Sequence, residues 1–303
     1  MPKVKQGKSV VVIGGFNAVH KGHAKLIGRA AEIAKLKNLK TVVFTFDENL
    51  GLHKKSLSFL SEKKRKELLL SLGADEIYVQ KFNKSFMALS PEGFVSEILV
   101  KKLAAAAVVV GENFHFGKNA SGDAKKLRSL CAEYGLDCHI LDLEKTDGGV
   151  IISSSLIKNL AAQGRVDEVY KYCGRPLTIS GVVIHGREEG RQIGFPTVNF
   201  LLPENVVVPG RGVYCSQVTL DNKTYPAITN IGSAPTFDSS EELAETHIIG
   251  FEKDLYGKTI EVSLIKKLRD IEKFDSKEKL INQLEKDKEI SVLINKQKKF
   301  RKD

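Results

Sequence analysis

The sequence predicts two domains of different class: an α/β domain with a doubly wound parallel sheet, then a small antiparallel β-barrel that ends in a helix. Three observations lead to this prediction. A chain of 303 residues is longer than one hydrophobic core usually serves. Up to about residue 173, apolar runs alternate with segments of helical spacing. Beyond Gly174 the apolar runs are short and separated by turn residues, so we place the domain limit between residues 1–175 and 176–303.

The first domain is predicted from alternating strands and helices. Residues 10–13 form a continuous apolar run that ends at Gly14, as buried parallel strands often do. Apolar residues at helical spacing follow from Leu26 to Ala34, and a second strand is expected over 41–46. Further elements are expected as helix 61–72, strand 76–79, helix 90–103, strand 108–110 and strand 138–141. A Rossmann-like sheet of this kind binds ligands beyond the carboxyl ends of its strands.

The second domain is predicted from short alternating runs. Strands are expected over 179–185, 213–220 and 260–265, which together favour a compact barrel. Ser276 is a helix-capping residue, and the apolar residues behind it are spaced as on one face of a helix over 276–293, namely Leu280, Ile281, Leu284 and Ile290. This helix would cover one side of the barrel.

Composition narrows the classes of function. The chain is 42% hydrophobic and 28% charged, as globular proteins are. No apolar run approaches the roughly 18 residues of a membrane helix, and the first residues lack a signal-peptide pattern, so we expect a cytoplasmic protein without membrane contact. The net charge of +10 indicates anionic partners, but the basic residues are spread along the chain, and nucleotide phosphates account for them as well as nucleic acid does. We expect no nucleic-acid partner, and a monomer or weak oligomer.

The segment from Gly14 to His23 joins the first strand to the first helix. Glycines here let the backbone approach a phosphate, and the helix N-terminus offers free N–H groups and positive potential. His20 and His23 are three residues apart, so they share one face of the opening turn and can donate hydrogen bonds to phosphoryl oxygens. The alternative is a pair of structural histidines.

This segment resembles a known family. Residues 20–23, His-Lys-Gly-His, resemble the HxGH signature of nucleotidyltransferases, and residues 14–23 resemble its form in FAD synthetases. The resemblance implies adenylyl transfer from Mg-ATP by catalytic His20 and His23. The neighbouring residues that it implies for binding are Gly14, Phe16, Asn17 and Gly22.

Two later segments extend the resemblance. Residues 110–118, followed by Gly122 and Asp123, are similar to the family's flavin-site loop, which implies binding by Asn113 and Phe116. Residues 152–158 resemble its Ser-Ser-Thr segment, in which hydroxyls at a helix start and a cation one turn on would bind a triphosphate. The residues concerned are Ser153, Ser154, Ser155 and Lys158. An ordinary helix cap is the alternative for the serines.

The second domain has its own phosphate-binding candidate. Residues 181–199 form a glycine-punctuated loop with two arginines between strands, where backbone amides and guanidinium groups would hold phosphates; the candidates are Gly186, Gly190, Arg191 and Gly194. Thr197 and Asn199 are two apart on a strand and face one side, where their oxygens could reach Mg²⁺ or a phosphate. A plain hairpin connector is the alternative.

This loop closely resembles the riboflavin kinase signature. Downstream segments match that signature in order, at 212–214, 230–232, 235–237, 245–247 and 254–257. The resemblance implies that Glu245 is the general base, taking the proton from the ribityl 5′-hydroxyl, and that Thr197 and Asn199 hold the metal and phosphates. From about residue 9 to 290 the chain thus resembles the bacterial bifunctional riboflavin kinase/FMN adenylyltransferase (FAD synthetase) family, which implies riboflavin, FMN and ATP as small-molecule partners and Mg²⁺ as cofactor.

Two alternatives remain at this point. The chain has Asn17, Ala18 and Lys158 where the first family usually has Asp, Gly and Arg, so the first domain could be a weak or silent partner of a kinase. A flavin-sensing or RNA-binding regulator on an enzyme-derived scaffold is the other alternative. The intact set of Thr197, Asn199 and Glu245 argues against that regulator, because a binding module has no chemical need of it.

Overall fold

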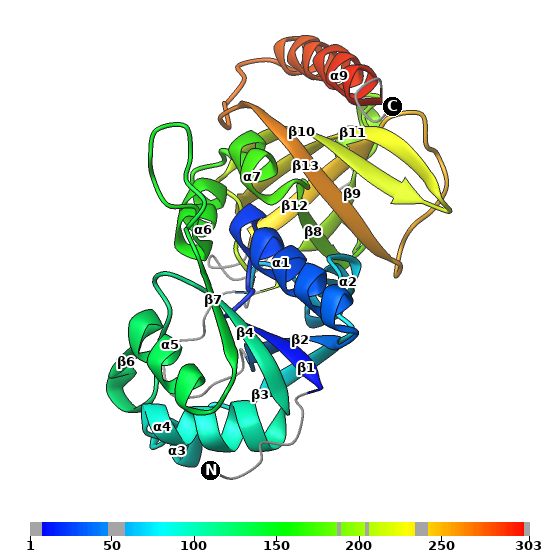
Figure 1. The fold of residues 1–303 in the computed structure, drawn as a ribbon. Helices are drawn as coiled ribbons and strands as arrows, with labels where there is room; N and C mark the ends of the chain where they lie inside the picture. The colour runs from blue at the N-terminus through cyan, green and yellow to red at the C-terminus, as the bar shows by residue number, and fades with distance from the viewer. Residues whose placement is uncertain (1–7, 48–57, 187–188, 204–205, 234–241, 300–303) are drawn as a thin grey trace. The chain divides into compact units, whose positions relative to one another are not determined.

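A computed structural model describes residues 8–47, 58–186, 189–203, 206–233 and 242–299 (Figure 1). The chain forms two compact units, Met1–Leu156 and Ile157–Asp303. Helices α6 (Ser154–Ala162) and α7 (Val166–Cys173), which the sequence led us to place in the first domain, therefore belong mostly to the second compact unit. The limit between residues 1–175 and 176–303 concerned which residues serve each activity, and it stays a prediction.

The first unit contains a five-stranded parallel sheet. Its strands are β1 (Ser9–Ile13), β2 (Lys40–Phe46), β3 (Glu76–Gln80), β4 (Ala105–Gly111) and β7 (Asp137–Leu141). They lie in the order β3-β2-β1-β4-β7, with every neighbouring pair parallel. This order confirms the doubly wound fold, and its direction reverses between β1 and β4, which is the point where such sheets bind ligands.

Helices cover both faces of this sheet (Figure 1). One face packs on α1 (Lys21–Lys37) and α2 (Glu62–Ser71), and the other packs on η1 (Phe94–Lys102) and α5 (Ala124–Glu133). Side chains alternate along β1, so Val10 and Val12 face α1 while Val11 and Ile13 face α5 and η1. A strand buried on both faces must be apolar throughout, and this explains the continuous runs in the sequence.

Short elements connect the later strands. They are α3 (Lys84–Met87), α4 (Pro91–Gly93), β5 (His115–Phe116), η2 (Lys118–Ala120) and β6 (Gly122–Asp123). The helix predicted from residue 90 begins as expected, because the Ser90 hydroxyl accepts a hydrogen bond from the Gly93 amide at 3.0 Å. It then widens into the π-helical η1, at whose end the Leu103 amide bonds the Ile98 carbonyl at 2.9 Å, five residues back.

The second unit contains a six-stranded antiparallel sheet. Its strands are β8 (Leu177–Val182), β9 (Val198–Leu201), β10 (Gly212–Leu220), β11 (Lys223–Ser233), β12 (Glu242–Ile248) and β13 (Thr259–Arg269), in the order β8-β13-β10-β11-β12-β9. Just beyond β8, the Ile184 amide donates to the Asn199 carbonyl of β9 at 2.8 Å. The two outer strands therefore meet, and the sheet nearly closes into the predicted barrel. The short helix α8 (Glu189–Gln192) lies in the loop between β8 and β9.

Helix α9 (Lys277–Lys299) packs on β10 and β11. The predicted cap is present, since the Ser276 hydroxyl accepts from the Lys279 amide at 3.3 Å. The buried stripe, however, is polar and consists of Asp287, Ser291 and Asn295, whereas Ile290 is 44% exposed. Apolar spacing thus identified the helix but not the face that packs. Among the described residues, no helix is both long and apolar enough to cross a membrane.

Candidate active sites

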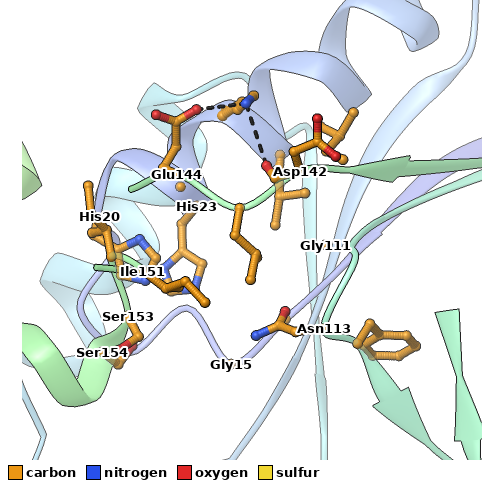
Figure 2. A pocket seen from close by; sticks show the side chains of 18 of the residues that line it. Gly15, His20, His23, Gly111, Asn113, Asp142, Glu144, Ile151, Ser153 and Ser154 are labelled. Carbon is orange, nitrogen blue, oxygen red and sulfur yellow. Dashed lines mark hydrogen bonds and ion pairs between the residues drawn. The ribbon is translucent and has the colours of Figure 1, made fainter. Parts of the chain in front are cut away.

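A pocket of about 270 Å³ lies in the first unit, at the carboxyl ends of β1, β4 and β7 (Figure 2). Its walls come from the β1–α1 loop, the first turns of α1, the residues that follow β4 and β7, and the residues that precede α6. This is the edge at which the sequence placed the ligand. All of its lining residues belong to the first unit.

Two stacked histidines form one wall. The rings of His20 and His23 lie 3.8 Å apart between centroids, with an angle of 17° between their planes. His20 is the N-cap of α1, so both rings stand at the positive end of the helix dipole. A Cβ at Gly22 would lie 3.2 Å from the His20 ring, and glycine therefore leaves the space that this ring occupies. The pair is suited to hold an anionic group.

Two aromatic residues predicted to bind ligand are buried and are not among the described residues that line the pocket. Phe16 is fully buried at a positive φ of 50°, and its ring contacts that of His23 at 4.9 Å between centroids. A Cβ at Gly14 would lie 3.0 Å from the Phe16 ring, which explains this glycine. Phe116 is also buried, and it stacks on Phe114 with centroids 5.5 Å apart. Of these two neighbours it is Phe114 that lines the pocket.

The remaining sequence candidates divide between wall and periphery. Those that line the pocket are Gly14, His20, Gly22, His23, Asn113, Ser153 and Ser154. Across the pocket from the histidines lies Asn113 (Figure 2). Ser153 also accepts a hydrogen bond from the Leu156 amide at 3.2 Å, so it caps α6 while it lines the wall. The candidates outside the lining are Phe16, Asn17, Phe116, Ser155 and Lys158.

Sequence reasoning missed a charged pair at the rim of the pocket. The Lys25 ammonium donates to the Glu144 carboxylate at 2.7 Å and to the Asp142 carbonyl at 3.5 Å (Figure 2). Lys25 is the one Lys or Arg among the described lining residues, and it extends from the second turn of α1. The sequence did contain a sign of this pair, because Asp142 and Glu144 closely follow the strand predicted over 138–141, at the edge of the sheet where ligands bind.

The second candidate site lies on three neighbouring strands of the barrel. Glu245 of β12 is paired with Asn230 of β11 on one side and with Asn199 of β9 on the other. Directly paired residues share one face of a sheet, so the three side chains form a row. The Asn230 side-chain amide donates to the Glu245 carboxylate at 3.0 Å, which fixes the orientation of that carboxylate.

Asn199 has the features of a ligand to a cation. It is 6% exposed, and its Oδ1 is buried with no hydrogen-bond partner among the described residues. Leaving a buried carbonyl oxygen without a donor costs free energy, and a hard cation such as Mg²⁺ would offset that cost. A Cβ at Gly186 would lie 1.9 Å from the Asn199 Nδ2, so this glycine is required by the position of Asn199. The Asn199 amide oxygen is thus a ligand of a type that fits a magnesium ion.

The loop before β9 is tightly folded. A Cβ at Gly190 would lie 2.3 Å from the Phe195 carbonyl oxygen, and Gly194 has a φ of 84°, so both glycines serve the turn. Arg191 is exposed on α8, and Thr197 lies two residues before Asn199. Residues 235–237, which also carry the riboflavin kinase resemblance, lie outside the described residues.

Comparisons with known proteins match each half of the chain to a family of flavin-metabolising enzymes. A family model described as FAD synthetase matches residues 3–156, and one described as riboflavin kinase matches residues 173–293. The chain is 35% identical over 295 residues to the bifunctional riboflavin kinase/FMN adenylyltransferase of Buchnera aphidicola from Schizaphis graminum, covering 93% of this chain and 92% of that one.

Two further bacterial relatives have the same description, and a solved structure shares the fold over nearly the whole chain. The proteins of the same description from Escherichia coli K12 and Bacillus subtilis 168 are each 34% identical, covering 95% and 96% of this chain and 93% of theirs. A solved structure from Streptococcus pneumoniae, described as a macrolide-efflux protein, is 32% identical with a TM-score of 0.87 and covers 95% of both chains.

Proposed function

The chain belongs to the family of bifunctional riboflavin kinase/FMN adenylyltransferases, and we propose that each of its two sites catalyses one of the two reactions. The protein phosphorylates riboflavin with ATP to give FMN and ADP. It then transfers an adenylyl group from a second ATP to FMN, giving FAD and pyrophosphate. The row Asn199–Glu245–Asn230 is the single observation that carries the assignment of residues.

In the kinase site, Glu245 acts as the general base. Its carboxylate takes the proton from the ribityl 5′-hydroxyl as the hydroxyl oxygen attacks the γ-phosphorus of ATP, and ADP leaves. The hydrogen bond from Asn230 holds the carboxylate oxygen in place during this transfer. Asn199 and Thr197 would hold Mg²⁺, which neutralises phosphate charge when it is bound.

In the adenylyltransferase site, an oxygen of the FMN phosphate attacks the α-phosphorus of ATP, and pyrophosphate leaves. His20 and His23 donate hydrogen bonds to the phosphoryl oxygens, where negative charge accumulates. Ser153 and Ser154, at the start of α6, contact the phosphates. Lys25 can leave Glu144 to pair with the departing pyrophosphate. Asn17 and Lys158, which differ from the usual motif, are not among the described residues that line the pocket.

A direct assay tests the assignment. Purified protein is incubated with riboflavin, ATP and Mg²⁺, and FMN and FAD are followed by chromatography. We expect Glu245→Gln to lose FMN formation by about 10²–10⁴-fold while still converting supplied FMN to FAD. His20→Ala should do the reverse and accumulate FMN.

Two other results would revise the proposal. FMN without FAD from the unsubstituted protein would leave a kinase with a silent first unit. Absence of any flavin product would remove the enzymatic assignment altogether.

The cytoplasmic location is also a proposal, which the four free thiols support because reducing compartments keep cysteines in that form.

A further inference from the structure

His247 is a residue of the matched segment 245–247 that the mechanism above does not use. It lies on β12 two residues after Glu245, so the two side chains share one face of the strand. Its Nδ1 is 2.8 Å from the Pro196 carbonyl oxygen. A carbonyl oxygen can only accept, so Nδ1 carries the hydrogen and donates it. This bond joins the strand of the general base to the loop that precedes Thr197.

Backbone pairing alone does not reach Thr197. The ladder between β9 and β12 ends with the pair of Val198 and Thr246, and β9 itself begins at Val198. Asn199 is therefore positioned by strand pairing, whereas Thr197 lies in front of the ladder. Beyond this last backbone pair, β12 is joined to the loop before β9 by a side chain, through the hydrogen bond from His247 to the Pro196 carbonyl.

A second contact reinforces the first. The ring of Phe195, which is buried, packs against the His247 ring with centroids 5.1 Å apart. The Lys288 ammonium of α9 also lies 5.5 Å from the centroid of the Phe195 ring. Phe195 thus contacts both β12 and α9, Pro196 is bonded to β12, and Thr197 follows them directly.

We propose that His247 is a positioning residue for phosphoryl transfer: by binding Pro196 to β12, it holds Thr197 in line with Asn199 and Glu245. This inference rests on the proposed kinase function of the same strands. In this role His247 contacts neither riboflavin nor ATP. Its effect passes through the loop that it fixes, so its loss changes how Mg²⁺ and ATP are held while the bound flavin is unaffected.

The surroundings of His247 favour the neutral ring. Burial lowers the pKa of His247, and the charge of Lys288 lowers it further, while the Pro196 hydrogen bond and Glu285 act in the opposite direction. A neutral ring with hydrogen on Nδ1 has a bare Nε2. Protonation at Nε2 in mild acid would leave the bond to Pro196 intact, so substitution is the sharper test.

Two substitutions separate the hydrogen bond from the bulk of the ring. In His247→Asn the side-chain NH₂ can occupy the place of Nδ1–H, whereas His247→Leu fills similar space without a donor. We expect His247→Leu to raise the Mg²⁺ and ATP concentrations for half-saturation by about tenfold, the effect of one lost hydrogen bond, with the riboflavin KM unchanged. His247→Asn should recover most of this loss.

Controls exclude a merely structural role. Conversion of supplied FMN to FAD by the same preparations reports on the first unit and should stay constant. Thr219→Val removes a different hydrogen bond of the same sheet, the 3.1 Å contact with Thr224, and should leave the kinase constants unchanged. A structural role alone would lower Tm and the active fraction while the Mg²⁺ dependence stayed as before.

Several outcomes would overturn the proposal. One is unchanged Mg²⁺ and ATP saturation in His247→Leu, and another is a His247→Asn protein as impaired as His247→Leu. If neither variant folds, ¹⁵N NMR of the unsubstituted protein decides, because hydrogen on Nε2 instead of Nδ1 is incompatible with the proposal. A wild-type protein that forms no FMN would instead count against the kinase assignment itself.

Discussion

Single residues in this protein are constrained by how closely the backbone passes other side chains. Among the glycines that the structure describes, Gly186 has the smallest clearance, because a Cβ there would lie 1.9 Å from the Asn199 Nδ2. We predict that Gly186→Ala displaces the Asn199 side chain and lowers kinase activity at least tenfold, with a raised Mg²⁺ requirement. Titration of kinase activity against Mg²⁺ checks this prediction.

Gly28 provides the matched control. It lies inside α1, where an added Cβ meets no atom within 4 Å. Gly28→Ala should leave both activities unchanged and stabilise the first unit by about 0.5–1 kcal/mol, because alanine is the better helix former. A Gly186→Ala protein with normal Mg²⁺ dependence would show that the Asn199 amide does not hold the metal.

We predict that His247 makes the stability of the barrel depend on pH. Because burial lowers its pKa in the folded state, the unfolded chain binds a proton below about pH 6.5 that the folded chain does not. Unfolding then takes up a proton, so stability falls as pH decreases from about 6.5 toward the folded-state pKa. The Tm difference between pH 7.5 and 5.5 should therefore be smaller in His247→Asn than in the unsubstituted protein. An NMR titration giving a His247 pKa at or above its ordinary value would contradict this expectation.

For single residues, the sequence predicted where a binding pocket lies better than it predicted which side chains line it. Glycine and histidine patterns at residues 14–23 located the pocket, because the chemistry of phosphate binding limits which residues can follow a strand. The same pattern could not show that Phe16 faces the core or that Lys25 pairs with Glu144. Those facts depend on which distant segments pack nearby, and local spacing does not contain that information. The roles assigned to the site residues stay predictions.

Helix α9 is held against the barrel by polar contacts, which the spacing of its apolar residues does not predict. Arg269 of β13 donates to the Asp287 carboxylate at 3.0 and 3.1 Å, and the Asp287 side chain is 2% exposed. Further along, Ser291 donates to the Ala227 carbonyl at 2.8 Å and Asn295 donates to the Ser216 carbonyl at 3.2 Å. A search for apolar periodicity finds Ile290 instead, because it assumes that the packed face is hydrophobic.

We predict that Asp287→Ala destabilises the barrel by about 2–4 kcal/mol, since it removes the carboxylate that pairs with the mostly buried Arg269 side chain. Denaturant unfolding followed by far-UV circular dichroism measures the loss. Asp275→Ala is the control, because Asp275 pairs with Lys279 at the exposed start of the same helix and its loss should cost about 0–1 kcal/mol. Equal effects of the two substitutions would mean that the buried pair contributes no more than a surface one.

The whole molecule combines two kinds of sheet whose sequence signals differ. Continuous apolar runs alternating with helical segments predicted the parallel strands of the first unit, and short runs separated by turn residues predicted the antiparallel strands of the second, so the class of each half was predictable. Strand order was not, because it depends on which strands meet after helices have crossed over. The domain limit at residue 175 stays a prediction, and it differs from the limit of the compact units because α6 and α7, which precede it in the sequence, belong mostly to the second compact unit.

Truncation measures what those helices contribute. Val166 and Val169 of α7 are fully buried, and the Gly210 amide donates to the Ala161 carbonyl of α6 at 2.9 Å. A fragment of residues 176–303 loses these contacts, and each buried apolar side chain contributes about 1.5–3 kcal/mol out of a total stability of about 5–15 kcal/mol. We therefore expect fragment 157–303 to fold and phosphorylate riboflavin, and fragment 176–303 to melt at a clearly lower temperature. Thermal unfolding and kinase assays of both fragments compare them directly. Equal stability would return α6 and α7 to the first domain and support the limit at residue 175, whereas the expected difference would make both helices part of the kinase unit.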